Sequence, residues 1–263
     1  MSLLNAKNLS LSLGNKSVVE QMDIYVNEGE FVGLIGPNGA GKSSLLRMLA
    51  GLVKPESGAV ELTPENTVTA IQEIPAQTRA RFMAYLAQHE IPAWPLSVKN
   101  LAALGRSPWN SSVNMNADDE LAIGNALAMT DVVSLAERAV TELSGGELQR
   151  VLLARVFAGN PRLVIVDEPI AALDIYHQLQ IMELLQSHAQ QGGAVIAALH
   201  DLSLASRFCS RLILMHRGKL VAAGEPVQVL TPENLATVYG VSAHVDCRED
   251  GVVIIPVKRV AHL

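Results

Sequence analysis

The chain has 263 residues, of which 49% are hydrophobic and 17% charged, a balance that excludes disorder and allows one large or two small domains, each with a core. Its 26 acidic residues exceed its 20 basic ones, which argues against a broad nucleic-acid-binding face, so we expect no nucleic acid partner. Cys209 and Cys247 fit neither a disulfide framework nor a CxxC metal site. No apolar run approaches the roughly 18 residues that cross a bilayer, and the first residues lack the features of a secretory signal, so we expect a cytoplasmic chain.

The N-terminal part is predicted to contain strands and one helix. Residues 3 to 35 read as strands, because apolar and polar residues alternate over 22–26 and a short buried run covers 31–35. Gly36 ends that run. Over 42–51 the apolar residues have the spacing of a helix that packs on a sheet. The order is therefore strand, glycine-rich loop, helix.

The middle of the chain changes character. Pro55 and Gly58 indicate a turn, and 83–86 is a further short strand. Between Gln88 and Leu143 the sequence predicts a helical insertion. Its helices are expected at residues 98–104 and 118–129, separated by a polar loop at 107–116.

After this insertion, helices and strands alternate. We expect helices at 145–158, 175–190 and 201–209, and strands at 163–166, 194–199 and 212–215. Such alternation predicts a parallel sheet covered by helices on both faces. A turn at Gly218 predicts that 220–223 pairs with the preceding strand as a hairpin, and 242–257 reads as a further small pair of strands.

The strongest local signal is a phosphate loop between the first buried strand and its helix. Residues 36–43 read Gly-Pro-Asn-Gly-Ala-Gly-Lys-Ser and fit the pattern GxxxxGK[ST]. Its glycines let backbone N–H groups surround phosphates, Lys42 reaches the β and γ phosphates, and Ser43 ligates Mg²⁺. The alternative, a glycine-rich turn without a ligand, is disfavoured by this context. The expected nucleotide-binding residues here are Gly36, Pro37, Asn38, Gly39, Ala40, Gly41, Lys42, Ser43 and Ser44.

Two adjacent carboxylates follow the apolar run 163–166. Asp167 is placed to hold Mg²⁺, and Glu168 is placed to face the γ-phosphate and polarise an attacking water as general base. Alone, an Asp-Glu pair after a strand is equally well a solvated loop. The phosphate loop upstream favours the catalytic interpretation.

A second glycine-rich segment reads Leu-Ser-Gly-Gly-Glu-Leu-Gln-Arg over 143–150. Ser144 and Glu147 predict an ordinary capping box at the start of a helix. Gly145 and Gly146 weaken a first helical turn, which makes sense where backbone must approach a ligand closely. We therefore predict a second anion-binding helix start here.

Over residues 2 to about 240 the chain resembles the ATP-binding cassette (ABC) ATPases. The resemblance depends on five features in order along the sequence: the phosphate loop, the Leu-Ser-Gly-Gly-Glu segment, the Asp-Glu strand end, Ala-Leu-Asp at 172–174 and His200. The resemblance implies an α/β P-loop NTPase core with a mixed, largely parallel sheet, an N-terminal antiparallel β subdomain and a helical insertion. It implies an ATP-binding domain at 2–240 with a helical subdomain at about 89–143, and a C-terminal β extension at 241–263.

The same resemblance implies a head-to-tail homodimer that hydrolyses ATP. The phosphate loop of one subunit and Ser144, Gly145, Gly146 and Glu147 of the other would enclose each ATP. Gln88 would sense Mg²⁺ and couple to a membrane partner, and His200 would order the γ-phosphate and the water. Asp174 would bridge the subunits, although its residue type also suits a helix N-cap, and His200 alone also suits a hydrogen-bonded loop residue.

Two positions depart from the family pattern. Leu13 stands where an aromatic residue usually stacks on adenine, and Ile170 stands where a polar residue often follows Glu-Pro. The first departure puts base stacking in question, and the second is one that activity should survive.

Segments 104–109, 230–234 and 238–240 are similar to the bacterial importers of ferric siderophores, haem and cobalamin. This resemblance implies a motor at the cytoplasmic face of the membrane that drives separate permease subunits, with an extracytoplasmic substrate-binding protein delivering the cargo. A groove between the Gln88 region and the insertion would receive a permease helix. The alternative is a soluble cassette that acts in cofactor or complex assembly without a permease. A small-molecule P-loop kinase is disfavoured, since the 143–147 segment would then have no role.

Overall fold

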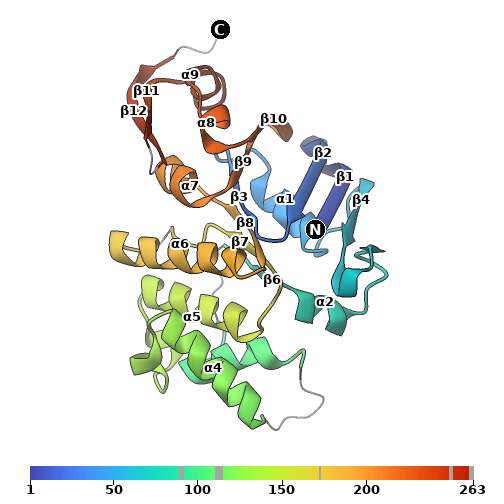
Figure 1. Cartoon of the computed structure of the whole chain (residues 1–263), viewed down its shortest axis with the longest axis vertical. Coiled ribbons are helices and arrows are strands. Elements are labelled where there is room, and N and C mark those ends of the chain that lie inside the picture. Colours follow the sequence, from blue (N-terminus) through green and yellow to red (C-terminus); the bar gives the residue numbers. More distant parts are fainter. Residues whose placement is uncertain (89–91, 110–114, 172, 249–250, 261–263) are drawn as a thin grey trace.

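The computed structural model describes residues 1–88, 92–109, 115–171, 173–248 and 251–260 (Figure 1). Parts of the predicted polar loop at 107–116, of the Ala-Leu-Asp segment and of the C-terminal extension lie outside the described residues, as does the start of the predicted helical subdomain. Within the described ranges the chain forms an N-terminal sheet, a central sheet, a layer of helices and a C-terminal hairpin.

The N-terminal sheet is antiparallel, as predicted. Its strand order is β2-β1-β4-β5, with β1 at Ser2–Leu13, β2 at Lys16–Asn27, β4 at Ser57–Leu62 and β5 at Thr69–Ala70. The turn predicted at Pro55 and Gly58 is wrong for Gly58, which lies inside β4, whereas Pro55 lies in the connection between α1 and that strand. Its φ is +86°, and a Cβ there would lie 2.3 Å from the carbonyl oxygen of Lys7, so glycine here serves close strand contact.

The central sheet has six strands in the order β10-β9-β3-β8-β7-β6. Five of them are parallel, as predicted: β3 (Phe31–Ile35), β6 (Met83–Leu86), β7 (Leu163–Asp167), β8 (Ala194–Ala198) and β9 (Arg211–His216). The predicted hairpin is confirmed, since β10 (Lys219–Gly224) pairs antiparallel with β9. Every residue of β3, β7 and β8 is buried, which explains their continuous apolar sequences.

The two faces of this sheet have separate cores. On one face, Leu34 and Ile165 pack with the apolar side of α1 (Lys42–Leu49) and with the N-terminal sheet. On the other face, Val164 and Val166 pack with α5 (Gly145–Ala158) and α6 (Ile175–Gln190). The sheet is therefore covered on both sides, and the loops at the carboxyl ends of its strands stay open for ligands.

The predicted insertion is helical and packs on α5 at one end of the molecule (Figure 1). It contains α3 (Val98–Ala103), which runs into a 3₁₀ turn at Leu104–Arg106, and α4 (Ala117–Met129). A Cβ on Gly105 would lie 2.0 Å from the carbonyl oxygen of Arg155, so that turn approaches α5 backbone to backbone. Among the described residues, no helix combines the length and apolar character needed to cross a bilayer.

The C-terminal segment forms the predicted pair of strands, β11 (Val241–Arg248) and β12 (Gly251–Arg259), at the opposite end of the molecule (Figure 1). The hairpin is fixed to α7 (Leu202–Phe208) by the buried hydroxyl of Ser206, which accepts a 3.0 Å hydrogen bond from the Val252 N–H. The remaining helices are α2 (Ala76–Phe82), α8 (Pro226–Val229) and α9 (Pro232–Asn234), with single turns at Pro64–Asn66, Val133–Leu135, Val140–Glu142 and Leu235–Tyr239.

Candidate functional site

The glycine-rich loop connects β3 to α1, as the sequence predicts. Gly36, Gly39 and Gly41 have φ angles of +147°, +78° and +102°, a region that side chains with a Cβ rarely adopt. A Cβ on Gly41 would also lie 2.3 Å from the carbonyl oxygen of Val18. The loop therefore needs glycine both for its conformation and for its contact with β2, and it leads into a helix N-terminus that favours anions.

Lys42, the first residue of α1, folds back over this loop. Its ammonium group donates to the carbonyl oxygens of Gly36 at 2.7 Å and Pro37 at 3.3 Å, and the residue is buried. Burial lowers the pKa of Lys42, while the carboxylates of Glu168 and Asp167 act in the opposite direction. These carboxylates favour the protonated, positively charged form of Lys42 at the place where phosphates would lie.

Asp167 ends β7 and is only 1% exposed. Both of its carboxylate oxygens are buried and make no hydrogen bond within the described residues. Burial raises the pKa of Asp167, and the nearby Ser43, Arg47 and Lys42 offset part of that effect. A buried carboxylate with two free oxygens beside a serine hydroxyl suits a hard divalent cation such as Mg²⁺.

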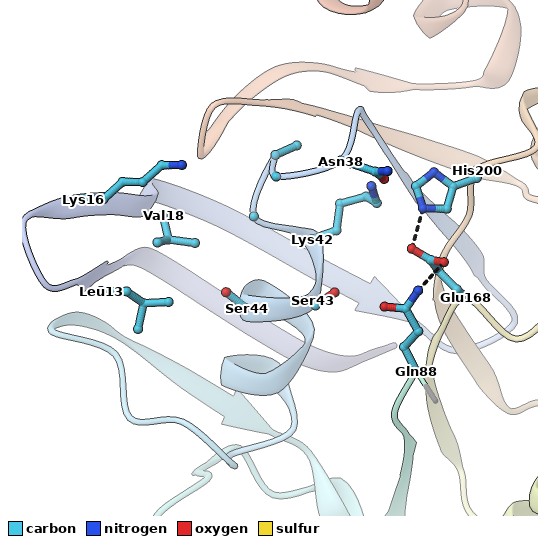
Figure 2. Close-up of a pocket in the computed structure, with 13 residues that line it drawn as sticks. Leu13, Lys16, Val18, Asn38, Lys42, Ser43, Ser44, Gln88, Glu168 and His200 are labelled. Carbon is cyan, nitrogen blue, oxygen red and sulfur yellow. Dashed lines mark hydrogen bonds and ion pairs between the residues drawn. The ribbon is translucent and has the colours of Figure 1, made fainter. Parts of the chain in front are cut away.

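Three predicted residues meet at the carboxyl ends of three neighbouring strands, since Gln88 follows β6, Glu168 follows β7 and His200 follows β8 (Figure 2). The Gln88 side-chain amide donates to Glu168 Oε2 at 2.6 Å, and His200 Nε2 is hydrogen-bonded to Glu168 Oε1. Glu168 adopts φ +54°, a conformation that costs a residue with a Cβ about 1–2 kcal/mol. The backbone thus holds this carboxylate at a fixed place between two polar partners.

A cavity of about 670 Å³ opens between the phosphate loop and these residues. Its walls contain most of the predicted nucleotide-binding residues together with three side chains from the tip of the β1–β2 hairpin. The lining residues are Leu13, Lys16, Val18, Asn38, Gly39, Ala40, Gly41, Lys42, Ser43, Ser44, Gln88, Glu168 and His200.

Lys16 and Val18 were not predicted from the sequence. They reach the cavity because the turn at Gly14, with φ +62°, pairs Leu13 with Lys16 across the hairpin. The sequence would have predicted these two lining residues only if the register of β1 against β2 had been known. The other departure, Ile170, is 6% exposed and belongs to the same buried core as the apolar residues of α6.

The second glycine-rich segment begins α5 with the predicted capping box. Ser144 N–H donates to Glu147 Oε2 at 2.8 Å, and Glu147 N–H donates to Ser144 Oγ at 3.3 Å. The hydrogen bond from the Ser144 N–H lowers the pKa of the Glu147 carboxyl. Neither these residues nor Gly145 and Gly146 line the cavity of the same chain.

Asp174 likewise lies outside that cavity and caps α6, where its Oδ1 accepts the His177 N–H at 2.9 Å. That hydrogen bond lowers the pKa of the Asp174 carboxyl. The N-cap role is thus confirmed, and a role between subunits stays a prediction. That Ser144 to Glu147 contribute to the nucleotide site of another copy of the chain stays a prediction as well.

Comparisons with known proteins agree with this geometry. Residues 19–171 match the family model described as ABC transporter. The hemin import ATP-binding protein HmuV of Rhodococcus jostii is 39% identical over 237 residues, which cover 90% of this chain and 80% of that protein. The protein of the same name from Photobacterium damselae subsp. damselae is 39% identical over 242 residues, covering 90% and 89%.

Solved structures give the same result. A putative metal-chelate type ABC transporter in an inward-facing conformation is 25% identical, with a TM-score of 0.81 over 98% of this chain and 97% of that chain. A dimeric ATP-binding cassette in a post-hydrolysis state with ADP and Pi is 26% identical, with a TM-score of 0.72 over 85% and 99%. The chain therefore belongs to the ABC transporter family and is one of its ATPases.

Proposed function

We propose that this chain is the ATP-hydrolysing motor of an importer that carries a haem-type metal chelate through a separate permease. The observation that carries this proposal is the convergence of Gln88, Glu168 and His200 on the phosphate-loop cavity. The import function and the chelate class are supported by the relatives named for hemin import and by the metal-chelate transporter structure.

In the proposed mechanism, the loop at Gly36 to Ser43 binds the triphosphate with its backbone N–H groups and Lys42. Asp167, Ser43 and Gln88 would hold Mg²⁺, which neutralises phosphate charge when bound. Glu168 accepts a proton from the attacking water. Its Oε2 accepts a hydrogen bond from the Gln88 side-chain amide, so displacement of that amide frees this oxygen for the water.

ATP hydrolysis is coupled to transport because each nucleotide site is formed by two copies of the cassette. The helix start at Ser144 to Glu147 lies outside the cavity of its own chain, so a complete site needs a second cassette. ATP then binds the closed dimer more tightly than the open one, and this difference in affinity drives closure. Hydrolysis removes the preference and lets the cassettes separate.

The permease would dock on an apolar groove beside the helical insertion. A hollow of about 590 Å³ is lined mainly by aliphatic side chains, and the indole of Trp94 at its edge is 73% exposed. An exposed tryptophan beside an apolar groove is typical of a protein interface. The remaining lining residues are Pro92, Ala93, Leu96, Leu101, Leu104, Leu152 and Arg155.

Two active-site variants test the catalytic roles. Glu168→Gln should retain ATP binding, lower turnover by about 10²–10⁴-fold and accumulate a nucleotide-bound dimer. Lys42→Ala should instead lose nucleotide affinity. Loss of ATP binding by Glu168→Gln would contradict the role assigned to its carboxylate.

Co-purification from native membranes, followed by mass spectrometry, tests the transport role. A polytopic permease should accompany the tagged chain, and Trp94→Glu should release it. Leu121→Glu is the matched control, since Leu121 is 64% exposed on α4 and lies outside the groove. Soluble partners alone would favour the alternative, an assembly factor without a permease. Haem-dependent ATPase activity of the reconstituted complex then tests the cargo class.

A further inference from the structure

The turn between β9 and β10 lies against the phosphate loop, although the two segments are far apart in the sequence. Its two residues are Arg217 and Gly218, because the strands pair His216 with Lys219. The Gly218 N–H donates to the Ala40 carbonyl oxygen at 3.0 Å. Neither turn residue lines the nucleotide cavity, so this contact reaches the loop from outside the site.

The conformation and the packing of this turn both depend on glycine. Arg217 and Gly218 have φ angles of +48° and +82°, and a type I′ turn requires two such positive values. Gly218 is buried, and a Cβ on it would lie 2.8 Å from the Val18 carbonyl oxygen. The same oxygen approaches Gly41, where a Cβ would lie 2.3 Å from it. Two glycines therefore let the turn and the phosphate loop pack around one carbonyl group of β2.

Both backbone polar groups of Gly218 have partners outside its own hairpin. Its N–H donates to Ala40, as described, and its carbonyl oxygen accepts a hydrogen bond from the Glu20 N–H at 2.8 Å. Glu20 lies on β2, and its carboxylate forms a 3.1 Å ion pair with Lys219. Because a buried backbone group without a partner is costly, these bonds hold the turn between β2 and the phosphate loop.

The bond to Ala40 fixes the orientation of one peptide group in the phosphate loop. A peptide bond is planar and trans, so its C=O and its N–H point in opposite directions. The Ala40 carbonyl group points at the turn, and the Gly41 N–H of the same peptide group therefore points away from the turn. Gly41 lines the cavity and the turn does not, so this orientation directs the N–H toward the place where phosphates would lie.

We propose that Gly218 is a positioning residue of the nucleotide site and that the β9–β10 turn sets the affinity of this site for phosphates. Displacement of the turn would let the peptide group between Ala40 and Gly41 rotate, and the ligand would then lose a donor that is already aimed at it. The proposal rests on the function proposed above, because it places the triphosphate at the phosphate loop. It goes beyond that function by assigning a role to a residue outside the cavity.

Equilibrium binding of ADP and of inorganic pyrophosphate, each with Mg²⁺, tests the proposal. Gly218→Ala places a Cβ against the Val18 carbonyl group and should weaken the binding of both ligands by about tenfold or more, because a hydrogen bond to a charged group is lost. Gly29→Ala is the matched control, since Gly29 has φ +79° but open space around it, in the turn between β2 and β3. This control should carry similar backbone strain and bind both ligands as the unmodified chain does.

A second pair of variants tests the turn without adding a clash. Arg217→Asn and Arg217→Val both remove the guanidinium group, but Asn accepts a positive φ and valine does not. Arg217→Asn should bind ADP as the unmodified chain does. Arg217→Val should bind ADP about twofold to fivefold more weakly, because only molecules with the turn in place bind well. It should also raise the KM for ATP and leave kcat nearly unchanged, since Glu168 and His200 follow other strands.

The proposal is overturned if folded Gly218→Ala binds both ligands as Gly29→Ala does, or if the two Arg217 variants bind ADP equally. Thermal unfolding shows which variants fold, and the Arg217 pair decides if Gly218→Ala does not. Weaker binding of ADP with unchanged binding of pyrophosphate would also contradict the proposal, because the effect would then lie at the nucleoside. An unmodified chain that binds neither ligand removes the phosphate site itself, and with it the proposed function.

Discussion

Compared with wild type, Asp167→Asn should be more stable without nucleotide and less stable with Mg-ADP bound. The wild-type carboxylate is 1% exposed, and neither of its oxygens is hydrogen bonded within the described residues. A buried polar group without partners costs about 1–3 kcal/mol, and more when it is charged. Removal of this charge also weakens the electrostatic support of Lys42, but Glu168 and two carbonyl oxygens still support that ammonium group. We therefore expect a net gain of about 1 kcal/mol in the free energy of unfolding.

The pH dependence of this gain has a definite sign. Burial raises the folded-state pKa of Asp167 above the unfolded value of about 3.9. Above the folded-state pKa the carboxylate is charged in both states and costs stability, and the cost disappears as pH falls below the unfolded value. The difference in unfolding free energy between Asp167→Asn and wild type should be largest at neutral pH and should vanish near pH 4 and below.

With Mg²⁺ and ADP present, wild type should be more stable than Asp167→Asn. A ligand at about 100 times its Kd stabilises the folded state by about 2.7 kcal/mol, and the variant should lose most of that gain with its Mg²⁺ ligand. Thermal unfolding at pH 8, 6 and 4, with and without Mg-ADP, measures all three effects. About 1 kcal/mol shifts the Tm of a chain of this size by about 2–4 °C.

Asp118→Asn on α4 is the control, because Asp118 is exposed and should change stability by less than about 0.5 kcal/mol. A nucleotide-free Asp167→Asn variant no more stable than wild type at pH 8 would refute the reasoning. So would a stability difference that grows as the pH falls.

Three further predictions concern one close backbone contact and two hydrogen bonds. Gly105→Ala should lower the free energy of unfolding by about 2–4 kcal/mol in chemical denaturation, because its Cβ would lie 2.0 Å from the Arg155 carbonyl oxygen. Gly124→Ala has open space around it in α4 and should raise the free energy of unfolding by about 0.5–1 kcal/mol. Ser206→Ala should cost about 1–3 kcal/mol, because it leaves the Val252 N–H without its buried acceptor, and hydrogen exchange should accelerate at that amide. Trp109→Phe should cost about 1 kcal/mol in the same denaturation assay, since it removes the 2.9 Å hydrogen bond from the indole to Gly159 O. Equal stability of the two glycine variants would contradict the close approach of the Gly105 turn to α5.

The elements that the sequence predicted best have strong local signals. β3, β7 and β8 are continuous apolar runs because both of their faces are buried. The limits of α5 and α6 agree with prediction because Ser144 and Asp174 are N-caps whose side chains satisfy backbone N–H groups within the same helix turn. Such signals depend on neighbouring residues, so they can be read without knowledge of the tertiary structure.

The elements that were missed lack those signals. The strand β4 contains Gly58, whose usual meaning in sequence is a turn, and it pairs with β1 more than 40 residues away. The helix α2 follows Pro75 without a side-chain cap, and Phe82 is its one buried residue among those described. Tertiary contacts fix both elements, and a single sequence does not show such contacts.

The site was predictable to the extent that sheet topology follows from sequence. Gln88, Glu168 and His200 are far apart in the chain, yet each follows a parallel strand, and the strand order β8-β7-β6 makes those strand ends neighbours. Since Glu168 accepts hydrogen bonds from the loops on both sides, a small movement at either loop changes which of its oxygens is free. The proposed permease groove is lined by Trp94, which is six positions after Gln88 in the sequence. Under the proposed function, permease contact that displaces the Gln88 amide should change turnover more than nucleotide affinity, because that amide hydrogen-bonds the carboxylate assigned as general base.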